Sequence, residues 1–286
     1  ARGLIQDRQG TVLAGNEQNY RIVMVREDAG DPRAALDRLS QLIPLGPEEI
    51  ERAVRDLMRN RPFVPVTIAD RLSWEQVARV AANAPALPGI TPEVGLSRHY
   101  PFGPEFAHAV GYVGPVSEAD LAARETPEPL LMIPRFQIGK VGVERELEES
   151  LRGSAGHRRV EVNAVGREMR ELGRTEGNPG RTVQLTLDRK LQAFCLARLG
   201  GHLSASAAVI EVRSGNVLAL ASYPSFDANL FVRGISVTDF NALRENPYRP
   251  MSNKAVQGAY PPGSTFKMVT ALAAFDAGLA SPEERI

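Results

Sequence analysis

The sequence predicts an α+β fold divided into about two domains, and three observations indicate it. The chain has 286 residues, and a single domain usually has about 100 to 200. Strand-like segments are followed by a run of helical spacing, and no internal repeat is present. A polar stretch rich in glycine and proline at residues 173–180 has linker composition. We therefore place a domain boundary there, between residues 1–175 and residues 180–286.

Composition and charge are those of a soluble globular protein, with 43% apolar and 24% charged residues. The 34 basic and 34 acidic side chains cancel, so nothing favours a nucleic-acid partner. No apolar run reaches the roughly 18 residues of a membrane span, and no secretory signal is present. The single cysteine, Cys195, excludes an internal disulfide. Because residue 1 already lies inside a patterned segment, we expect a trimmed N-terminus.

The first elements predict a hairpin followed by an insertion. Residues 2–7 and 12–13 are strand-like around a turn at Arg8-Gln-Gly10, and residues 20–25 form another strand. A small α+β insertion follows at about residues 30–135. Its predicted parts are helices in 32–43 and 48–58, the second opened by Pro47, a strand at 63–68, a helix at 77–82 with a capping box at Ser73, and short extended pieces and turns in 85–115.

The second half continues with alternating elements. Asp188 has the position of a helix cap, and Ser214-Gly-Asn216 separates two apolar strands as a tight turn would. The predicted elements are a charged helix within 139–153, a hairpin of 158–165 and 167–172 around Gly166, a strand at 182–187, a helix at 189–199, strands at 207–212 and 217–222, and a helix at 264–277.

A serine and a lysine stand out near the end of the chain, in Gly258-Ala-Tyr-Pro-Pro-Gly-Ser-Thr-Phe-Lys-Met268. The prolines and Gly263 allow a helix to begin near Ser264, and Lys267 then lies on the same face one turn along. A desolvated lysine can lose its proton and accept one from a hydroxyl, whereas arginine is always charged. This chain has only four lysines among 34 basic residues, so a lysine here indicates a base.

The bare Ser-x-x-Lys pattern also fits a capping serine with a solvated lysine. Its context favours catalysis, because the Pro-Pro-Gly approach and the long apolar helix behind it predict a buried helix start. The helix N-terminus would favour a developing alkoxide there.

Eight segments, in order, resemble the penicillin-binding proteins, specifically the monofunctional transpeptidases of the penicillin-binding protein 2 type that serve cell elongation. Pro261 favours this type, because division-type members usually carry an acidic residue there. The segments are 2–10, 107–114, 139–153, 161–167, 185–192, 215–222, 223–231 and 253–267. The resemblance implies an elongated stalk (a pedestal or dimerisation-type domain with the insertion as its head) followed by the N-terminal part of a transpeptidase domain with a serine β-lactamase-like fold.

The resemblance implies an acyl-enzyme mechanism without a cofactor. Ser264 would attack a D-Ala-D-Ala stem peptide, Lys267 would be its base, and the Ser264 N–H would supply half of the oxyanion hole. β-Lactams would acylate the same serine. Asn253 would support the floor of the site, in a structural or indirect role. Lys254 and Met268 depart from the family's usual arginine and proline.

Two further family motifs, Ser-x-Asn and Lys-[Ser/Thr]-Gly, do not follow Lys267. We therefore expect this chain to be inactive alone. The resemblance also implies a protein anchored by an N-terminal helix on the periplasmic side of the bacterial inner membrane. Its implied partners are a SEDS-type glycosyltransferase and a membrane-associated shape protein such as MreC.

Two other readings compete with the enzyme. In one, the stalk is a scaffold that docks elongation partners, mainly through the insertion. In the other, the chain is a serine β-lactamase or β-lactam sensor, which the roughly 180 preceding residues disfavour. The four histidines show no metal-ligand spacing, so we expect no metal. His108 fits packing or hydrogen bonding. The family's stalk pairs an early arginine with an acid, which predicts contact between Arg2 and Glu144.

Overall fold

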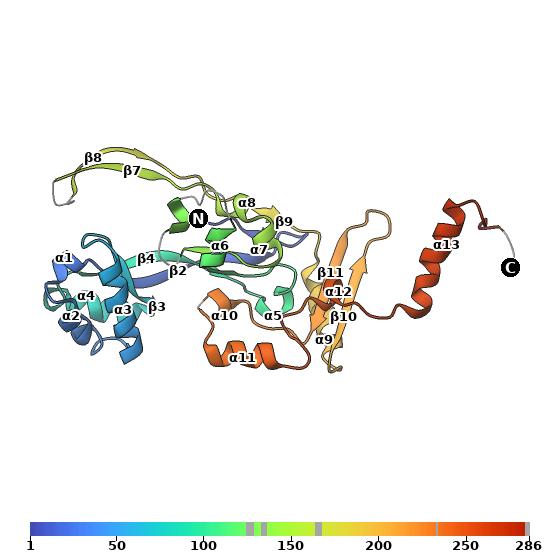
Figure 1. Ribbon diagram of the computed structural model, residues 1–286, viewed down its shortest axis with the longest axis horizontal. Coiled ribbons are helices and arrows are strands. Elements are labelled where there is room, and N and C mark those ends of the chain that lie inside the picture. The colour runs from blue at the N-terminus through green and yellow to red at the C-terminus, as the bar shows by residue number, and fades with distance from the viewer. Residues whose placement is uncertain (124–128, 133–135, 164–167, 233, 284–286) are drawn as a thin grey trace.

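The computed structural model describes residues 1–123, 129–132, 136–163, 168–232 and 234–283. The molecule is elongated, with a small helical head at one end, a strand-rich middle and a projecting helix at the other end (Figure 1). No helix in the described ranges is long and apolar enough to cross a membrane.

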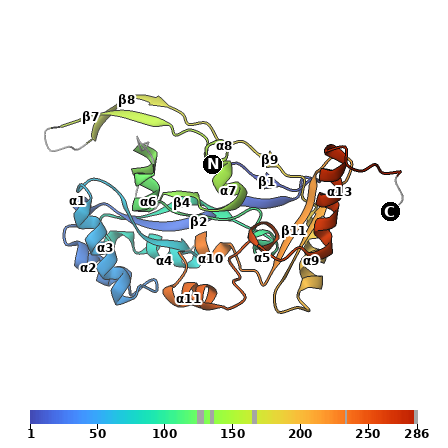
Figure 2. The same cartoon turned by 45° about the vertical axis from the view of Figure 1, so that its right-hand side comes forward.

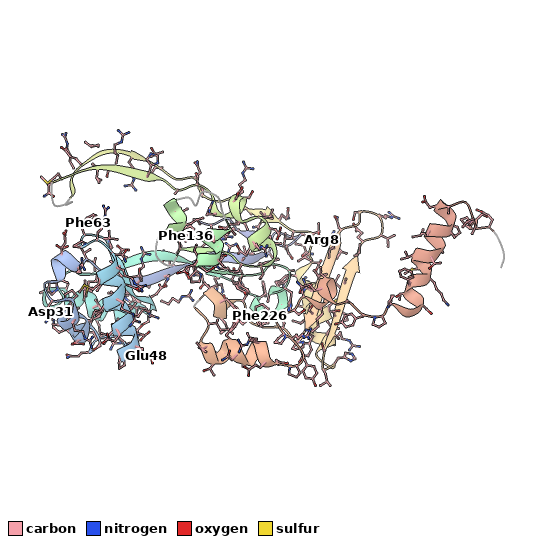
Figure 3. All side chains as sticks on the ribbon, in the orientation of Figure 1. Arg8, Asp31, Glu48, Phe63, Phe136 and Phe226 are labelled. Carbon is pink, nitrogen blue, oxygen red and sulfur yellow. The ribbon has the colours of Figure 1, made fainter. Side chains whose placement is uncertain are left out.

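The head is a small α+β unit with its own hydrophobic core. Asp31 caps its second helix by accepting hydrogen bonds from two backbone N–H groups, and Ser73 caps the fourth through the predicted box with Gln76. Figure 3 shows Asp31 and Glu48 on the outer helices. The head helices are α1 (Arg26–Ala29), α2 (Pro32–Leu39), α3 (Pro47–Arg59) and α4 (Trp74–Ala82), followed by the 3₁₀ turn η1 (Ala84–Ala86). Its core includes Ile22, Met24, Leu36, Leu39, Leu57, Val80 and Leu87.

Two long antiparallel strands carry the head. β2 (Val12–Met24) pairs with β4 (Ile90–His99) over ten positions, and we call this pair the ribbon. We predicted two separate strands within 12–25 and only short extended pieces and turns in 85–115. Both predictions are wrong, because β2 is one continuous strand and β4 has ten residues. No strand was predicted between residues 13 and 20, where the chain is mostly polar, but β4 supplies the backbone hydrogen bonds of this stretch.

Of the remaining strands of this sheet, β1 and β3 pair with β2, and β9 pairs with β1. The strand order is β3-β2-β1-β9, with β4 also paired to β2. β1 (Ile5–Gln6) forms the predicted N-terminal hairpin with β2, and β9 (Val183–Gln184) adds in parallel to β1. β3 (Val66–Leu72) lies three residues later than the strand predicted at 63–68.

A second hydrophobic core lies in the middle of the molecule. Phe226 in Figure 3 marks its position. The predicted insertion ends too late, because residues from 100 to 113 pack in this core and none of them in the head. The core joins residues from distant parts of the chain, namely Ile5, Leu13, Ala14, Tyr100, Phe106, Ala107, Val110, Val113, Leu151, Leu187, Phe226, Ala228, Phe231 and Val232.

Short elements surround this core. The predicted charged helix is divided at Leu147, whose backbone (φ −109°, ψ 24°) leaves the helical region. The elements are α5 (Gly103–Phe106), β5 (Val113–Pro115), α6 (Glu118–Ala122), η2 (Pro129–Met132), β6 (Gln137–Gly139), α7 (Gly142–Glu146) and α8 (Glu148–Arg152).

A two-stranded arm extends over the head, with β7 (His157–Val162) antiparallel to β8 (Glu168–Thr175) (Figure 1). The predicted turn around Gly166 lies outside the described residues. Residues 173–180 are not a free linker. Gly173 and Thr175 pair within the arm, and Gly180 N donates to Ala1 O at 2.9 Å. Glycine and proline here permit close backbone packing, which composition alone could not separate from flexibility.

The C-terminal part contains the predicted helix–strand–strand sequence. α9 (Arg189–Leu199) is capped by Asp188, and β10 (Ala205–Ile210) pairs with β11 (Val217–Tyr223). Gly215, with φ of 74°, closes the predicted tight turn between them. The last elements are α10 (Asn229–Val232), α11 (Val237–Glu245), α12 (Lys254–Gln257), η3 (Gly263–Phe266) and α13 (Lys267–Asp276). Figure 2 shows β11, α9 and α13 from another side.

Candidate active site

The predicted serine lies in a tight turn that leads into the last helix. Gly263 has φ of 54°, a left-handed conformation that glycine adopts without strain. The 3₁₀ turn η3 contains Ser264, and α13 begins at Lys267. The predicted helix at 264–277 is therefore present with a 3₁₀ first turn. Thr265 stabilises this turn, because its hydroxyl and its backbone N–H both donate to Pro262 O.

Ser264 and Lys267 lie on one face of this turn. The Lys267 N–H donates to Ser264 O, the i to i+3 bond of a 3₁₀ helix, in which these positions eclipse each other. No hydrogen bond joins their side chains within the part of the chain that the structure describes, and both residues are exposed. The predicted buried helix start is thus wrong for this chain, because none of the elements that the structure describes covers the turn.

The exposure extends along the whole of α13. The helix has no buried residue, and Figure 1 shows it standing apart from the middle of the molecule. Its exposed side chains include Met268, Val269 and Leu272. A helix that is apolar on most of its surface normally lies inside a protein, so the chemistry of α13 suits a buried position that this chain does not provide.

Asn253, which precedes the serine turn in the chain, forms hydrogen bonds with two segments that are distant in sequence. Its Nδ2 donates to His108 O at 3.3 Å, and its Oδ1 accepts from Ser222 Oγ at 3.5 Å. Ser222 Oγ in turn accepts from Ala255 N in α12. These contacts fix α12, which precedes the serine turn, against β11.

Lys254 is buried and His108 half-buried next to Asn253. His108 Nε2 lies 2.7 Å from Pro250 O, to which it donates, and its ring packs edge-on against Phe226. Burial lowers the pKa of His108 and also that of Lys254, whose amine donates to Arg249 O at 3.0 Å. The predicted packing role of His108 is confirmed. The burial of Lys254 was not predicted, although its departure from arginine had marked the position.

The predicted contact between Arg2 and Glu144 is confirmed. Arg2 Nε donates to Glu144 Oε2 at 2.7 Å, and Arg2 Nη2 donates to Glu148 Oε2 at 2.7 Å. Burial disfavours the charge of Arg2, but the two glutamates outweigh it, so the pKa of Arg2 is raised. This contact ties the first strand to α7 and α8.

Two residues that the sequence analysis did not consider complete this cluster. Arg98 Nε donates to the other Glu144 oxygen at 2.6 Å, and Tyr100 Oη donates to the same atom at 3.1 Å. Burial and, second, the Glu144 charge raise the pKa of Tyr100 well above its usual value. Both residues lie within the stretch 85–115, for which we predicted only short extended pieces and turns, so no sequence signal identified them.

Buried amides join the middle of the molecule to the C-terminal part. Gln192 Nε2 donates to Glu105 O and to Leu220 O, and its Oε1 accepts from Leu220 N. Asn229 brackets Tyr100, accepting from its N–H at 3.0 Å and donating to its C=O at 2.9 Å. Gln192 and Asn229 both lie in segments that carried the family resemblance, but the pattern did not show what their side chains do.

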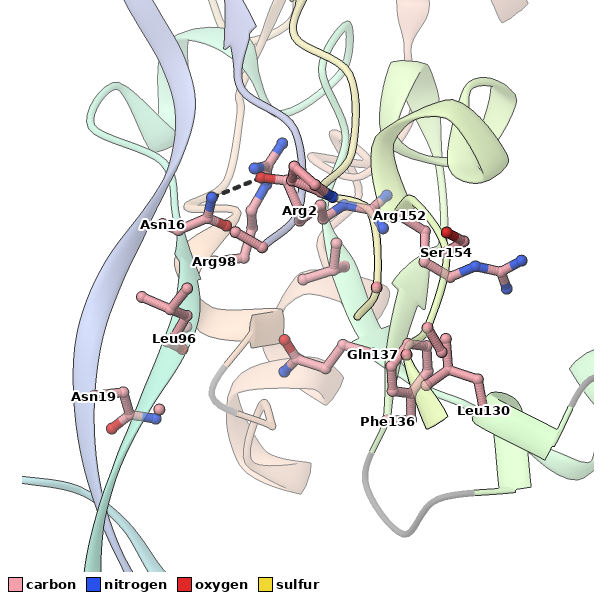
Figure 4. Close-up of a pocket in the computed structure, with 18 of the residues that line it drawn as sticks. Arg2, Asn16, Asn19, Leu96, Arg98, Leu130, Phe136, Gln137, Arg152 and Ser154 are labelled. Atoms are coloured by element: carbon pink, nitrogen blue, oxygen red, sulfur yellow. Dashed lines mark hydrogen bonds between the residues drawn. The ribbon is translucent and has the colours of Figure 1, made fainter. Parts of the chain in front are cut away.

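A separate cavity of about 710 Å³ lies between β4, β6 and residues 152–156 (Figure 4). Arg2, Asn16 and Arg98 gather at one end, where Asn16 Nδ2 donates to Arg2 O at 2.7 Å. Leu96 and Asn19 line the side formed by β4 and β2, and Leu130, Phe136 and Gln137 line the opposite side. None of the lining residues belongs to the serine turn. Within the described ranges, no three His, Cys, Asp or Glu side chains are arranged to hold a metal ion.

Comparison with known protein families matches nearly the whole chain. Residues 1–185 match the Penicillin-binding Protein dimerisation domain, and residues 205–286 match the Penicillin binding protein transpeptidase domain. The junction between the two matches lies close to α9. The first match alone covers more than half of the chain.

Curated relatives and a solved structure agree with these matches. Peptidoglycan D,D-transpeptidase MrdA of Escherichia coli (strain K12) is 38% identical over 280 residues, 98% of this chain and 44% of that protein. The protein of that name from Haemophilus influenzae is 34% identical over 286 residues, again 44% of its length. A complex between Penicillin-Binding Protein (PBP2) and MreC from Helicobacter pylori superposes with a TM-score of 0.81 at 25% identity, covering 100% of this chain and 53% of that one. The chain spans less than half the length of these curated relatives.

Proposed function

The chain belongs to the penicillin-binding protein 2 family, and we propose that the full-length protein is a peptidoglycan D,D-transpeptidase that cross-links stem peptides during cell elongation. One observation carries the catalytic part of this proposal. Ser264 and Lys267 share one face of the turn that opens α13, at the start of a helix whose composition suits burial. The names of the relatives support the reaction class.

In the proposed reaction the Lys267 amine, uncharged in the assembled site, takes the proton of Ser264 Oγ. The alkoxide attacks the carbonyl of the penultimate D-alanine, the amide C–N bond breaks, and the proton held by Lys267 passes to the nitrogen of the departing D-alanine. An amine of a neighbouring strand then attacks the acyl-enzyme and gives a proton to Lys267, the ester bond breaks, and Lys267 returns that proton to Ser264 Oγ. The Ser264 N–H supports the oxyanion. β-Lactams acylate the same hydroxyl.

The exposure of the serine turn fits this proposal if further residues of the transpeptidase domain cover α13 in the full-length protein. Covering would exclude water from the Lys267 amine, the condition under which a lysine can act as a base. This chain alone would then lack a closed site and turn over no substrate. Asn253, through Ser222 and α12, would hold the floor of that site.

A fluorescent penicillin tests the two roles in the full-length protein. Ser264→Ala should abolish labelling, because the nucleophile is gone. Lys267→Arg should slow acylation by about 10²-fold or more, since arginine keeps the charge but cannot act as a base. Lys190→Arg, an exposed lysine on α9, is the matched control and should label normally. Labelling of Ser264→Ala at the normal rate would refute the assignment.

The division of the chain is part of the proposal. Residues 1–175 would be the non-catalytic pedestal, with a head whose core comes from residues 22–90, and residues 180–286 would begin the transpeptidase domain. An N-terminal helix would anchor the protein on the periplasmic side of the inner membrane. No cofactor is needed for the proposed chemistry.

A scaffold role is the second candidate, and the relative solved with MreC favours it. The pedestal would dock a shape protein of the MreC type and a SEDS-type glycosyltransferase. The two roles are separable, because Ser264→Ala should leave partner binding unchanged while penicillin labelling is lost. Loss of binding in that variant would contradict a docking surface on the pedestal.

A further inference from the structure

The head has a hydrophobic core that is separate from the core in the middle of the molecule. Its core and the second core share no residue. The ribbon runs from one to the other, with Leu13 of β2 in the second core and Ile22 of the same strand in the head core. Two-stranded ribbons twist readily, so side contacts must help to fix the orientation of the head.

One such contact begins at a bulge in β3. Tyr20 pairs with Leu72 and Ile22 with Ala69, so β3 carries an extra residue between these pairs. Arg71 lies in this bulge with φ of 57°, a left-handed conformation that is uncommon for a side chain other than glycine. A bulge redirects a side chain out of the regular sheet pattern.

The strained backbone is held in place by a polar side chain on the neighbouring strand. Asn19 Oδ1 accepts from Arg71 N at 2.9 Å, and Asn19 Nδ2 donates to Asp70 Oδ1 at 2.5 Å. Asp70 Oδ1 also accepts from Arg71 N. A left-handed residue persists where its surroundings determine it in this way, and such residues gather at functional positions.

The Arg71 side chain reaches from the head to the transpeptidase part. Its Nη2 donates to Ser97 Oγ of β4 at 2.8 Å and to Val232 O at 3.1 Å. Val232 is buried and ends α10, where a helix leaves carbonyl groups without partners in its own backbone. A cation is favoured at this end of a helix.

A second donor meets the same carbonyl. Gln137 Nε2, from the start of β6, donates to Val232 O at 3.0 Å. Figure 4 shows the Gln137 side chain at the cavity, on the side opposite Leu96 and Asn19. Three segments that are far apart in sequence therefore converge on one main-chain oxygen.

We propose that Arg71 is a brace that fixes the orientation of the head relative to the transpeptidase part, with Val232 O as its anchor and Gln137 as the second support. When the brace is held, the head and the segment 226–232 move as one body. When it is released, the head swings on the ribbon. The brace would transmit a load placed on the head by a docked protein, a consequence that rests on the scaffold role proposed above.

The orientation can be measured with spin labels in the full-length protein. Labels at Arg55→Cys on α3 and Lys190→Cys on α9, both exposed positions, report the distance between the head and the transpeptidase part. Cys195 is first replaced by serine. Arg71→Gly removes the brace and keeps a residue that tolerates the left-handed backbone. It should broaden the distance distribution and shift its centre, and adding Gln137→Leu should broaden it further.

Arg21→Ala is the matched control. Arg21 lies beside the bulge but binds Glu93 across the ribbon at 2.6 Å, inside a single body. In the Arg21→Ala variant, the distribution of distances between the two spin labels should stay as narrow as in the protein that carries only the labels and the Cys195 replacement. A narrow, unshifted distribution in both Arg71→Gly and the double variant would overturn the proposal. Because the measurement needs no catalysis, it succeeds or fails independently of the transpeptidase assignment.

Discussion

The two cores of this chain are built differently. The head core takes all its members from residues 22–90 and contains only apolar side chains. The second core combines residues 5–151 with residues 187–232, and the half-buried Arg2 and the buried Arg98 and Glu144 lie beside it. A local core can close through apolar contact alone. The second core is shared between distant segments, and beside it each buried charge is paired with a charge of opposite sign from another segment.

The largest expected effect comes from removing the charge at the centre of the second core. Glu144→Ala leaves Arg2 and Arg98 buried without this carboxylate, and we expect a loss of about 3–5 kcal/mol in unfolding free energy. Urea unfolding measures it. Glu93→Ala breaks an exposed pair with Arg21 and should cost about 0–1 kcal/mol. Equal losses in the two variants would show that the buried charges do not stabilise this core.

Large-to-small substitutions in each core test whether the cores are separate. Leu36→Ala in the head should cost about 2–5 kcal/mol, and Phe231→Ala in the second core about 3–5 kcal/mol. Hydrogen exchange locates the damage. Leu36→Ala should speed exchange in α2 and α3 only, whereas Phe231→Ala should speed it in residues 100–113 and around α10. Faster exchange in both regions for either variant would mean that the cores unfold together.

A small effect, comparable to that of Glu93→Ala, is expected outside both cores, at the ion pair of Asp120 with Lys140. Burial would raise the pKa of Asp120, but hydrogen bonds from Lys140 and Ser117 lower it to about 2 from 3.8. A lowered carboxylate pKa stabilises the folded state above pH 3.8, and this stability is lost as the pH falls toward about 2. Asp120→Asn should cost about 1 kcal/mol at pH 7, with the difference vanishing near pH 2. A constant difference across this range, measured by urea unfolding, would contradict the pairing.

Local signals in the sequence predicted many elements correctly. The structure confirms the features that depend only on neighbours in the chain. These are the helix caps at Ser73 and Asp188 and the turn at Ser214-Gly-Asn216. The family resemblance predicted the contact of Arg2 with Glu144, which no spacing rule could give. The roles of Ser264 and Lys267 stay predictions, because their chemistry depends on residues that pack around them.

Long-range pairing explains what the sequence did not predict. The polar middle of β2 resembles a loop until β4 supplies its hydrogen-bond partners, and Arg71 gives no sign of its bulge. Residues 173–180 have linker composition, but Gly173 and Thr175 pair within the arm and Gly180 bonds to Ala1. In each case the residues that pair with the segment lie far away in the sequence, where periodicity and turn patterns give no information about them.

The sharing of the second core has a practical consequence for anyone cloning this protein. The family match for the first domain ends at residue 185, which makes that position an inviting place to stop an expression fragment. A fragment cut there would omit Phe226, Phe231 and Val232 and leave apolar surface bare around Tyr100 and Val113. A pedestal intended for partner screening is better designed to run through α10.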